Sequence, residues 1–258
     1  MRNVLAVAGK ELRAYFHSPI AYLVMTVWTA LCGFIFYVLT GNLVAQTLRM
    51  QMMGGRGAPP ISLNEFIIRN MLQGILMVVL LFLLPLITMR LYAEEKRSGT
   101  IELLVTSPLT DLEIILGKFL GALVLYAVLI AIAFLYIGVL FLYGNPNARP
   151  LIANALGLLL FGTGLLALGI CISAFTKNQI IAGIVSEVIF LVLWILDWIQ
   201  SFSTGKVASV VSYISLSTHL DNFAKGVIDL GDVVYFVSMA ALGLFLTARS
   251  VEALKGRA

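Results

Sequence analysis

Apolar residues fill six long runs of this chain, and short polar segments separate the runs. The runs lie near residues 19–40, 67–89, 113–143, 152–175, 180–199 and 233–248. A helix needs roughly 20 apolar residues to cross about 30 Å of hydrocarbon, so each run is long enough to span a membrane. The runs lack the polar/apolar alternation of barrel strands and are too long for them. The pattern predicts an all-α integral membrane protein with six transmembrane helices.

The composition supports the same class. Of the 258 residues, 60% are hydrophobic and only 12% are charged, which is more apolar surface than a soluble domain of this length can bury. The first run is full length and follows a polar stretch, so we expect no cleavable signal peptide. Cys32 and Cys171 each fall inside a run, where we interpret them as reduced packing residues.

The basic residues predict the orientation. Eleven of the 17 lie on one side of the predicted spans, namely Arg2, Lys10, Arg13, Arg90, Lys96, Arg97, Lys118, Lys177, Arg249, Lys255 and Arg257. The others are Arg49, Arg56, Arg69, Arg149, Lys206 and Lys225. Since basic loops remain in the cytoplasm, we expect both termini there, with residues 41–66 and 200–232 outside. These loops explain the net charge of +4, so no nucleic-acid partner is needed.

Residues 1–17 form an amphipathic pattern. Apolar Leu5, Ala8, Leu12 and Tyr15 share one helical face, and polar Lys10, Arg13 and His17 share another. The pattern predicts a helix that lies along the membrane surface before Pro19 turns the chain inward. A simple basic anchor is the alternative. In residues 200–232, apolar spacing favours short helices at the outer face.

A charged hairpin over residues 90–112 connects the second and third runs. The second run continues past Met89 as a charged helix, which Ser98 and Gly99 break. Thr100 can then cap a new short helix over residues 101–106. The hairpin is therefore predicted to carry a separate short helix outside the membrane.

Signals after the short helix restart the chain as the third span. Pro108 ends the short helix, and Thr110 with Glu113 has the spacing of a capping box. The short helix projects apolar Leu103 and Leu104 away from the bilayer, and an exposed apolar helix indicates a partner with a complementary groove. The alternative is that the loop folds back on its own protein.

These residues also carry a family resemblance. The run PLITMRLYAEEKRSGTIELLVTSPLTDLEIILGKFLGA (85–122) resembles the corresponding loop of bacterial ABC-2 type permeases, closest to the gliding-motility-associated and nitrous-oxide-reductase-maturation subgroup. THLDNFAKGVIDLGDVVYF (218–236) resembles the final outer loop of that subgroup. The resemblance covers nearly the whole chain and implies a single transmembrane domain over residues 1–258. The first outer loop, MQMMGGRGAPP, departs from the pattern.

The resemblance implies the function and the partners. Residues 1–17 would be an elbow helix, and residues 90–112 would carry a coupling helix seated on an ABC ATPase subunit, present in two copies, that holds ATP and Mg. A second permease chain, identical or different, would complete the complex. The complex would lie in the bacterial cytoplasmic (inner) membrane and contact membrane lipid. An accessory extracytoplasmic subunit is a further expected partner. The substrate, lipid-like or polymeric, stays open. We assign the ATPase contact to Glu94, Glu95, Thr100, Glu102, Leu103, Leu104, Thr106 and Lys177.

Motifs for chemistry in this chain itself are missing from the sequence. A P-loop needs Gly-Lys followed by Ser or Thr, whereas the three Gly-Lys pairs are followed by Glu11, Phe119 and Val207. Ser217, His219 and Asp221 are close in sequence, which is poor evidence for a catalytic triad. We expect no catalytic, cofactor-binding or metal-binding residues, and hence no enzyme activity in this polypeptide.

Glu187 is an acidic residue well inside the fifth run, about 10 Å from its cytoplasmic end. A lone charge at that depth is costly, so the side chain should face the protein interior or a cavity. It is a candidate intramembrane polar site, and a neutral packing role is equally open. Two rival functions are kept beside the permease: a secondary transporter or channel, and a non-transporting membrane scaffold.

Overall fold

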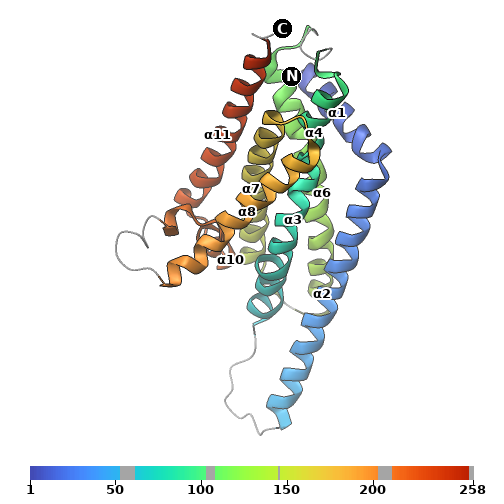
Figure 1. Ribbon diagram of the computed structural model, residues 1–258. Coiled ribbons are helices and arrows are strands. Elements are labelled where there is room, and N and C mark those ends of the chain that lie inside the picture. Colours follow the sequence, from blue (N-terminus) through green and yellow to red (C-terminus); the bar gives the residue numbers. More distant parts are fainter. Residues whose placement is uncertain (53–61, 103–107, 145, 203–210, 256–258) are drawn as a thin grey trace.

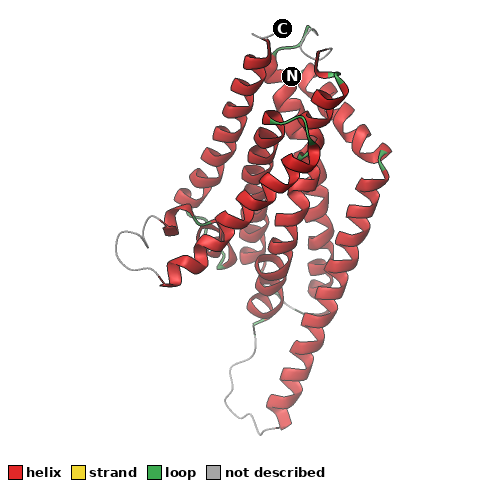
Figure 2. Cartoon of the chain, in the orientation of Figure 1, coloured by secondary structure: helices red, strands yellow, loops and turns green. Residues whose placement is uncertain are grey.

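The computed structural model describes residues 1–52, 62–102, 108–144, 146–202 and 211–255. Throughout these ranges the regular structure is helical, and they contain no strand (Figure 2). The elements are α1 (Arg2–His17), α2 (Pro19–Met52), η1 (Asn64–Leu76), α3 (Met77–Thr88), α4 (Arg90–Ser98), α6 (Asp111–Tyr143), α7 (Ala148–Phe175), α8 (Gln179–Phe202), α10 (Leu216–Ala224) and α11 (Leu230–Lys255).

Within these described ranges, six segments are long and apolar enough to cross a membrane, which confirms the predicted fold class. They are Ala21–Met52, Asn64–Ser98, Asp111–Tyr143, Ala148–Phe175, Gln179–Leu196 and Leu230–Ala253. Figure 1 shows both termini at the same end of the bundle, together with α1 and α4. The chain therefore crosses the bundle an even number of times and returns to the side from which it starts.

The first spanning helix is longer than expected. We predicted an outer loop over residues 41–66, but α2 continues to Met52 and residues 63–66 are helical, so the loop prediction is wrong for residues 41–52 and 63–66. Leu43 and Leu48 favour helix, and one interior glycine, Gly41, costs only about 1 kcal/mol relative to alanine. The denser glycine and proline cluster begins at Gly54, within residues 53–61, which lie outside the described part of the chain.

The second span begins as a π-helix. In η1 the hydrogen bonds reach one residue further than in an α-helix, as at its end, where Met77 N–H donates to the Leu72 carbonyl. The segment then continues into α3 and α4 without leaving the helical region. Segments of this type are rare and are often found at functional sites.

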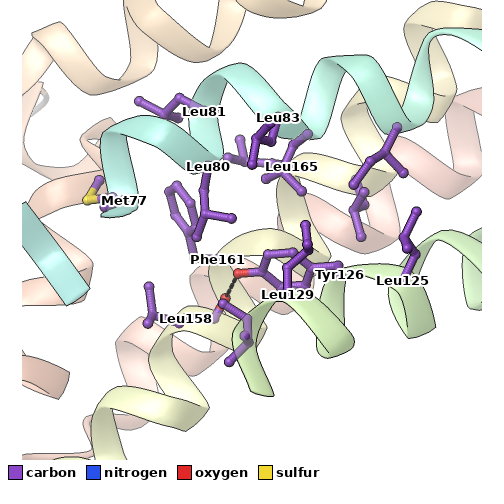
Figure 3. Close-up of a cluster of buried hydrophobic side chains, with 14 of the residues drawn as sticks. Met77, Leu80, Leu81, Leu83, Leu125, Tyr126, Leu129, Leu158, Phe161 and Leu165 are labelled. Atoms are coloured by element: carbon purple, nitrogen blue, oxygen red, sulfur yellow. Dashed lines mark hydrogen bonds between the residues drawn. The ribbon is translucent and has the colours of Figure 1, made fainter. Parts of the chain in front are cut away.

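The core lies where α3, α6 and α7 meet (Figure 3). Leu80 of α3, Leu129 of α6 and Phe161 of α7 are all fully buried. The Tyr126 hydroxyl of α6 donates to the Leu158 carbonyl of α7, as the dashed line in Figure 3 shows. Gly162 makes this contact possible, because a Cβ there would lie 2.1 Å from the Tyr126 ring. Van der Waals packing of this kind is what associates helices in lipid.

The expected short helices between the fifth and sixth spans are present where the structure describes them. Residues 211–214 form a helical turn and α10 follows, with Leu220 and Phe223 buried against the bundle. Gly226, at φ +81°, then redirects the chain toward α11. Residues 203–210 of the predicted region lie outside the described ranges.

Candidate functional site

The charged hairpin is rooted in α4, which continues α3 past Met89. Leu91, Tyr92 and Ala93 are buried, although the sequence of α4 is strongly polar. Gly99 ends the helix in the left-handed region at φ +76°, a conformation that glycine adopts without a steric penalty. The predicted break at this glycine is therefore confirmed.

Lys118 of α6 is the centre of the site. Its side chain is 1% exposed, and its three ammonium hydrogens have three acceptors: Glu11 Oε1 at 2.8 Å, Glu95 Oε1 at 2.8 Å and the Leu91 carbonyl at 2.9 Å. Glu11 belongs to α1, whereas Glu95 and Leu91 belong to α4. One buried ammonium therefore joins three helices, two of which carry the carboxylates that offset its charge.

Lys10 adds a second cation at the surface of this cluster. Its Nζ lies 3.1 Å from Glu95 Oε1 and 3.6 Å from Glu11 Oε1. Partial burial lowers the pKa of the Lys10 ammonium, but the nearby Glu95 and Glu11 carboxylates outweigh this effect, and the net shift is upward. The two lysines and two glutamates balance in formal charge.

Ser173 of α7 binds the backbone at the junction of α3 and α4. Its Oγ accepts hydrogen bonds from the Tyr92 and Ala93 N–H groups, both at 3.1 Å, and donates to the Met89 carbonyl at 2.9 Å. Lys96 also donates to the carbonyl of Ala174, beside Ser173. The base of the hairpin is thus bound to α7 as well as to α1 and α6.

Two glycines on α6 form the surface against which α1 packs. A Cβ at Gly117 would lie 2.5 Å from the Val7 Cβ, and one at Gly121 would lie 2.9 Å from the Glu11 Cβ. Such close approach is typical of small residues four apart at helix contacts. The GxxxG pair in this chain therefore brings α1 close enough for Glu11 to reach Lys118.

The buried face of α1 differs from the expected apolar face. Of the predicted apolar face, Ala8 and Tyr15 are buried within the protein but Leu5 is 67% exposed, whereas Val7 and Glu11 are buried. The reason is the position of the two glycines, which select the face that includes Glu11. The Tyr15 hydroxyl donates to the Ile87 carbonyl at 2.8 Å, so this face of α1 also contacts α3.

The predicted capping box at the start of α6 is confirmed. Glu113 N–H donates to Thr110 Oγ at 3.3 Å, and Thr110 N–H donates to Glu113 Oε2 at 3.1 Å. Asn3 of α1 donates to the other Glu113 oxygen at 3.0 Å. The return of the hairpin into the membrane is therefore also bound to α1.

The residues assigned to the ATPase contact have different environments. Glu94 and Thr100 are exposed and line a charged cleft of about 780 Å³ between α1 and α4. Glu102 and Lys177 are exposed outside this cleft. Glu95 also borders the cleft, but its Oε1 is bound to Lys118 and Lys10. Leu103, Leu104 and Thr106 lie outside the described residues, so their assignment stays a prediction.

Glu187 is half-buried on α8 and lines a groove against α3. Its Oε1 is buried and accepts no hydrogen bond from the part of the chain that the structure describes. The assignment of Glu187 as an intramembrane polar site stays a prediction. A neutral packing role would need a hydrogen bond from an Asn, Gln or Ser side chain. No such side chain in the described ranges donates to this oxygen.

The residues weighed as a triad do not form one. His219 Nδ1 lies 2.6 Å from Asp232 Oδ1, and its Nε2 lies 3.0 Å from the Tyr213 carbonyl. Asp221 instead pairs with Arg69 and with Lys225, each at 2.5 Å. Both ring nitrogens of the histidine are therefore occupied by groups other than Ser217 and Asp221. The His219–Asp232 pair connects α10 to the first turn of α11.

Both cysteines lie within the described ranges. Cys32 and Cys171 are both free and buried, as expected of packing residues. The same ranges contain no group of three or more His, Cys, Asp or Glu residues placed to hold a metal ion.

Sequence reasoning missed Glu11, Lys118 and Ser173. Lys118 carried a usable signal, because a lysine between apolar residues of a spanning helix requires a buried anion. Glu11 carried another, since it lies four residues before Tyr15 on the same helical face. The partners themselves are 107 residues apart for Glu11 and Lys118 and 81 apart for Tyr92 and Ser173, so only tertiary structure pairs them.

Comparison with known proteins gives one positive result. The family model described as ABC-2 type transporter matches residues 2–220. The match includes α1, the hairpin and the first five spanning segments. No curated protein matches the chain.

Proposed function

The chain belongs to the ABC-2 type transporter family and is a permease subunit of an ABC transporter. The family implies, in general, an ABC ATPase partner and dimerisation. We propose that the hairpin of this chain couples ATP hydrolysis in that ATPase to movement of a substrate across the membrane. ATP and Mg would be held by two copies of the ATPase, because this sequence has no P-loop. The proposed location is the bacterial cytoplasmic (inner) membrane, with both termini in the cytoplasm.

The arrangement around α4 supports this proposal. A helix that only closed a loop would need few contacts, but α4 is bound to α1 and α6 through Lys118 and to α7 through Ser173. A displacement applied to the hairpin therefore acts on three other helices. Because α6 and α7 both continue across the membrane, the displacement can change the arrangement of the spans, as coupling requires.

The exposed residues supply the surface for the ATPase. Glu94 and Thr100 border the charged cleft beside the hairpin, and Glu102 lies further along the hairpin. Leu103 and Leu104 would enter a groove on the ATPase. Burial of each leucine side chain is worth about 1.5–3 kcal/mol, so this pair would dominate the affinity while the charged residues fix the orientation.

Co-purification tests the proposal. The full chain and its ATPase are expressed together, and the wild type is compared with the double variant Leu103→Asp/Leu104→Asp. We expect the double variant to lose the ATPase in pull-down, or to retain it with substrate-independent hydrolysis. A permease that retained wild-type assembly and coupling with both aspartates would show that the hairpin is not the docking arm.

A matched control is available at the other end of the molecule. Val227 and Ile228 are each 54% exposed between α10 and α11, so Val227→Asp/Ile228→Asp adds the same charges far from the hairpin. This control should co-purify with the ATPase as the wild type does. If the wild-type chain itself captured no ABC ATPase, a secondary transporter or a scaffold would become the better interpretation.

A further inference from the structure

The groove beside Glu187 has the form of a ligand site. It has a volume of about 510 Å³ and lies between α3 and α8. Its walls are apolar, with Phe82 and Leu86 on α3 and Ile184 and Val188 on α8. Each of these four side chains is at least 42% exposed, so the groove is open at the side of the bundle.

Gly183 widens the groove at its cytoplasmic end. A Cβ at this position would lie 3.2 Å from Met89 Sδ, which is closer than ordinary van der Waals contact. Glycine therefore leaves room at the point where Met89 faces α8. Met89 also carries the carbonyl to which Ser173 donates, so the groove and the base of the hairpin share this residue.

Glu187 is the ionisable residue of the lining. Its Oε1 is buried and has no hydrogen-bond donor among the described residues. A buried carboxyl oxygen without a donor is unfavourable, whether the group is charged or neutral. A ligand that brings a positive charge to this oxygen would remove the deficit, whereas an anion would increase it.

We propose that this groove binds a hydrophobic organic cation, with the apolar body between α3 and α8 and the positive charge against the Glu187 carboxylate. The observations favour this class because apolar walls and a single acidic group match an apolar molecule with a single positive charge. A polyanionic or sugar-like ligand would find neither compensating cations nor a set of hydrogen-bonding groups among the lining residues.

The position of the groove connects such a ligand to the hairpin. Leu86 and Met89 also line a second cavity of about 190 Å³, which reaches Arg90 and Glu94. Arg90 and Glu94 in turn border the charged cleft. A ligand that displaces Met89 would therefore act on the segment bound by Ser173. This inference rests on the proposed function, for which it names a substrate class.

Equilibrium binding of tritiated tetraphenylphosphonium tests the inference. This cation has a permanent charge, so its own ionisation does not change with pH. The full chain is reconstituted in lipid nanodiscs, and binding to empty nanodiscs is subtracted. We expect saturable binding to the wild type, weakened at least about tenfold in Glu187→Gln, because a contact with a charged group is lost. Neutral triphenylphosphine oxide should not compete.

Two further variants separate the groove from the charge. Ile184→Trp narrows the groove without altering Glu187 and should also weaken binding, whereas Val185→Trp adds similar bulk outside the groove lining and should not. Glu65→Gln, which removes an exposed carboxylate elsewhere, should leave binding unchanged. Thermal unfolding of each variant confirms that it is folded before its affinity is compared.

Three results would overturn the inference: no saturable binding to folded wild-type protein, equal affinity in Glu187→Gln, or cross-linking of two Ile184→Cys chains together with absence of binding. The last result would assign the groove to a second permease copy. The ATPase pull-down is performed on the same preparations. Loss of the ligand site with an intact pull-down would reject only the substrate class, and the reverse would reject only the coupling.

Discussion

Lys118 on α6 and Glu95 on α4 form a buried ion pair, with 2.8 Å between Nζ and Oε1. Glu95 was expected to face the ATPase, and the pair shows that it also faces inward. Because Glu11 of α1 shares the same ammonium, the angle of α4 depends on the positions of α1 and α6. The hairpin is therefore part of the bundle and not an appendage to it.

Lys118→Met should destabilise the protein strongly. The substitution leaves the Glu11 and Glu95 carboxylates buried without their cation, and breaking a buried pair in this way typically costs about 3–5 kcal/mol. Thermal unfolding in detergent measures the loss. Lys177→Met, at an exposed lysine, should change stability by no more than about 0.5 kcal/mol. Equal effects of the two variants would contradict the assigned role of Lys118.

A second version of this test separates pairing from packing. Adding Glu95→Gln and Glu11→Gln to Lys118→Met removes the uncompensated charges. We expect the triple variant to recover part of the stability lost in the single variant, since neighbouring sites are not additive. If the triple variant is instead less stable than Lys118→Met by the sum of the losses measured for Glu95→Gln and Glu11→Gln alone, the charges do not interact as the geometry indicates.

Ser173→Ala should loosen the base of the hairpin. It removes the acceptor of two backbone N–H groups and the donor to the Met89 carbonyl, and each buried group left unpaired costs about 1–3 kcal/mol. Hydrogen exchange provides the direct measurement, because the Tyr92 and Ala93 amides should exchange faster. Ser238→Ala, at an exposed serine on α11, serves as the control and should leave both amides protected.

Gly117→Ala should separate α1 from α6. The added Cβ would lie 2.5 Å from the Val7 Cβ and 3.0 Å from the Val4 carbonyl oxygen, so α1 must move. Overpacking of this kind typically costs about 1–3 kcal/mol. Gly138→Ala, on the same helix with nothing within 4 Å, should be neutral or stabilising, as alanine favours helix. Comparison of the two unfolding temperatures tests the contact.

The sequence predicted the spans because the bilayer imposes a length and an apolar composition that a single segment must satisfy. It predicted the Thr110–Glu113 capping box and the break at Gly99 because both depend on residues a few positions apart. It failed for residues 41–52, where the helix-breaking residues begin later than assumed. Local signals were thus sufficient for the spans, the capping box and the break at Gly99, but they placed the end of α2 too early.

The site was only partly predictable for the opposite reason. A helical wheel of residues 1–17 gives an apolar face, but it does not say which neighbouring face packs on α6. Gly117 and Gly121 decide this, and they lie more than a hundred residues away. The outward residues Glu94 and Thr100 were identified from the loop, whereas Glu11, Lys118 and Ser173 required the folded arrangement.

The orientation of the whole bundle gives the last prediction. The helix that ends at Ser98, α4, lies at the end of the molecule that holds both termini (Figure 1). Ala148 follows α6, a helix of 33 residues and about 50 Å that runs to the other end. In a chain with Cys32 and Cys171 replaced by alanine, Ala148→Cys should react with a membrane-impermeant maleimide on intact cells. Ser98→Cys should react only after the cells are permeabilised. The expectation follows from the excess of basic residues on the side of the hairpin. Labelling of Ser98→Cys but not Ala148→Cys on intact cells would reverse the orientation and place the hairpin out of reach of a cytoplasmic ATPase.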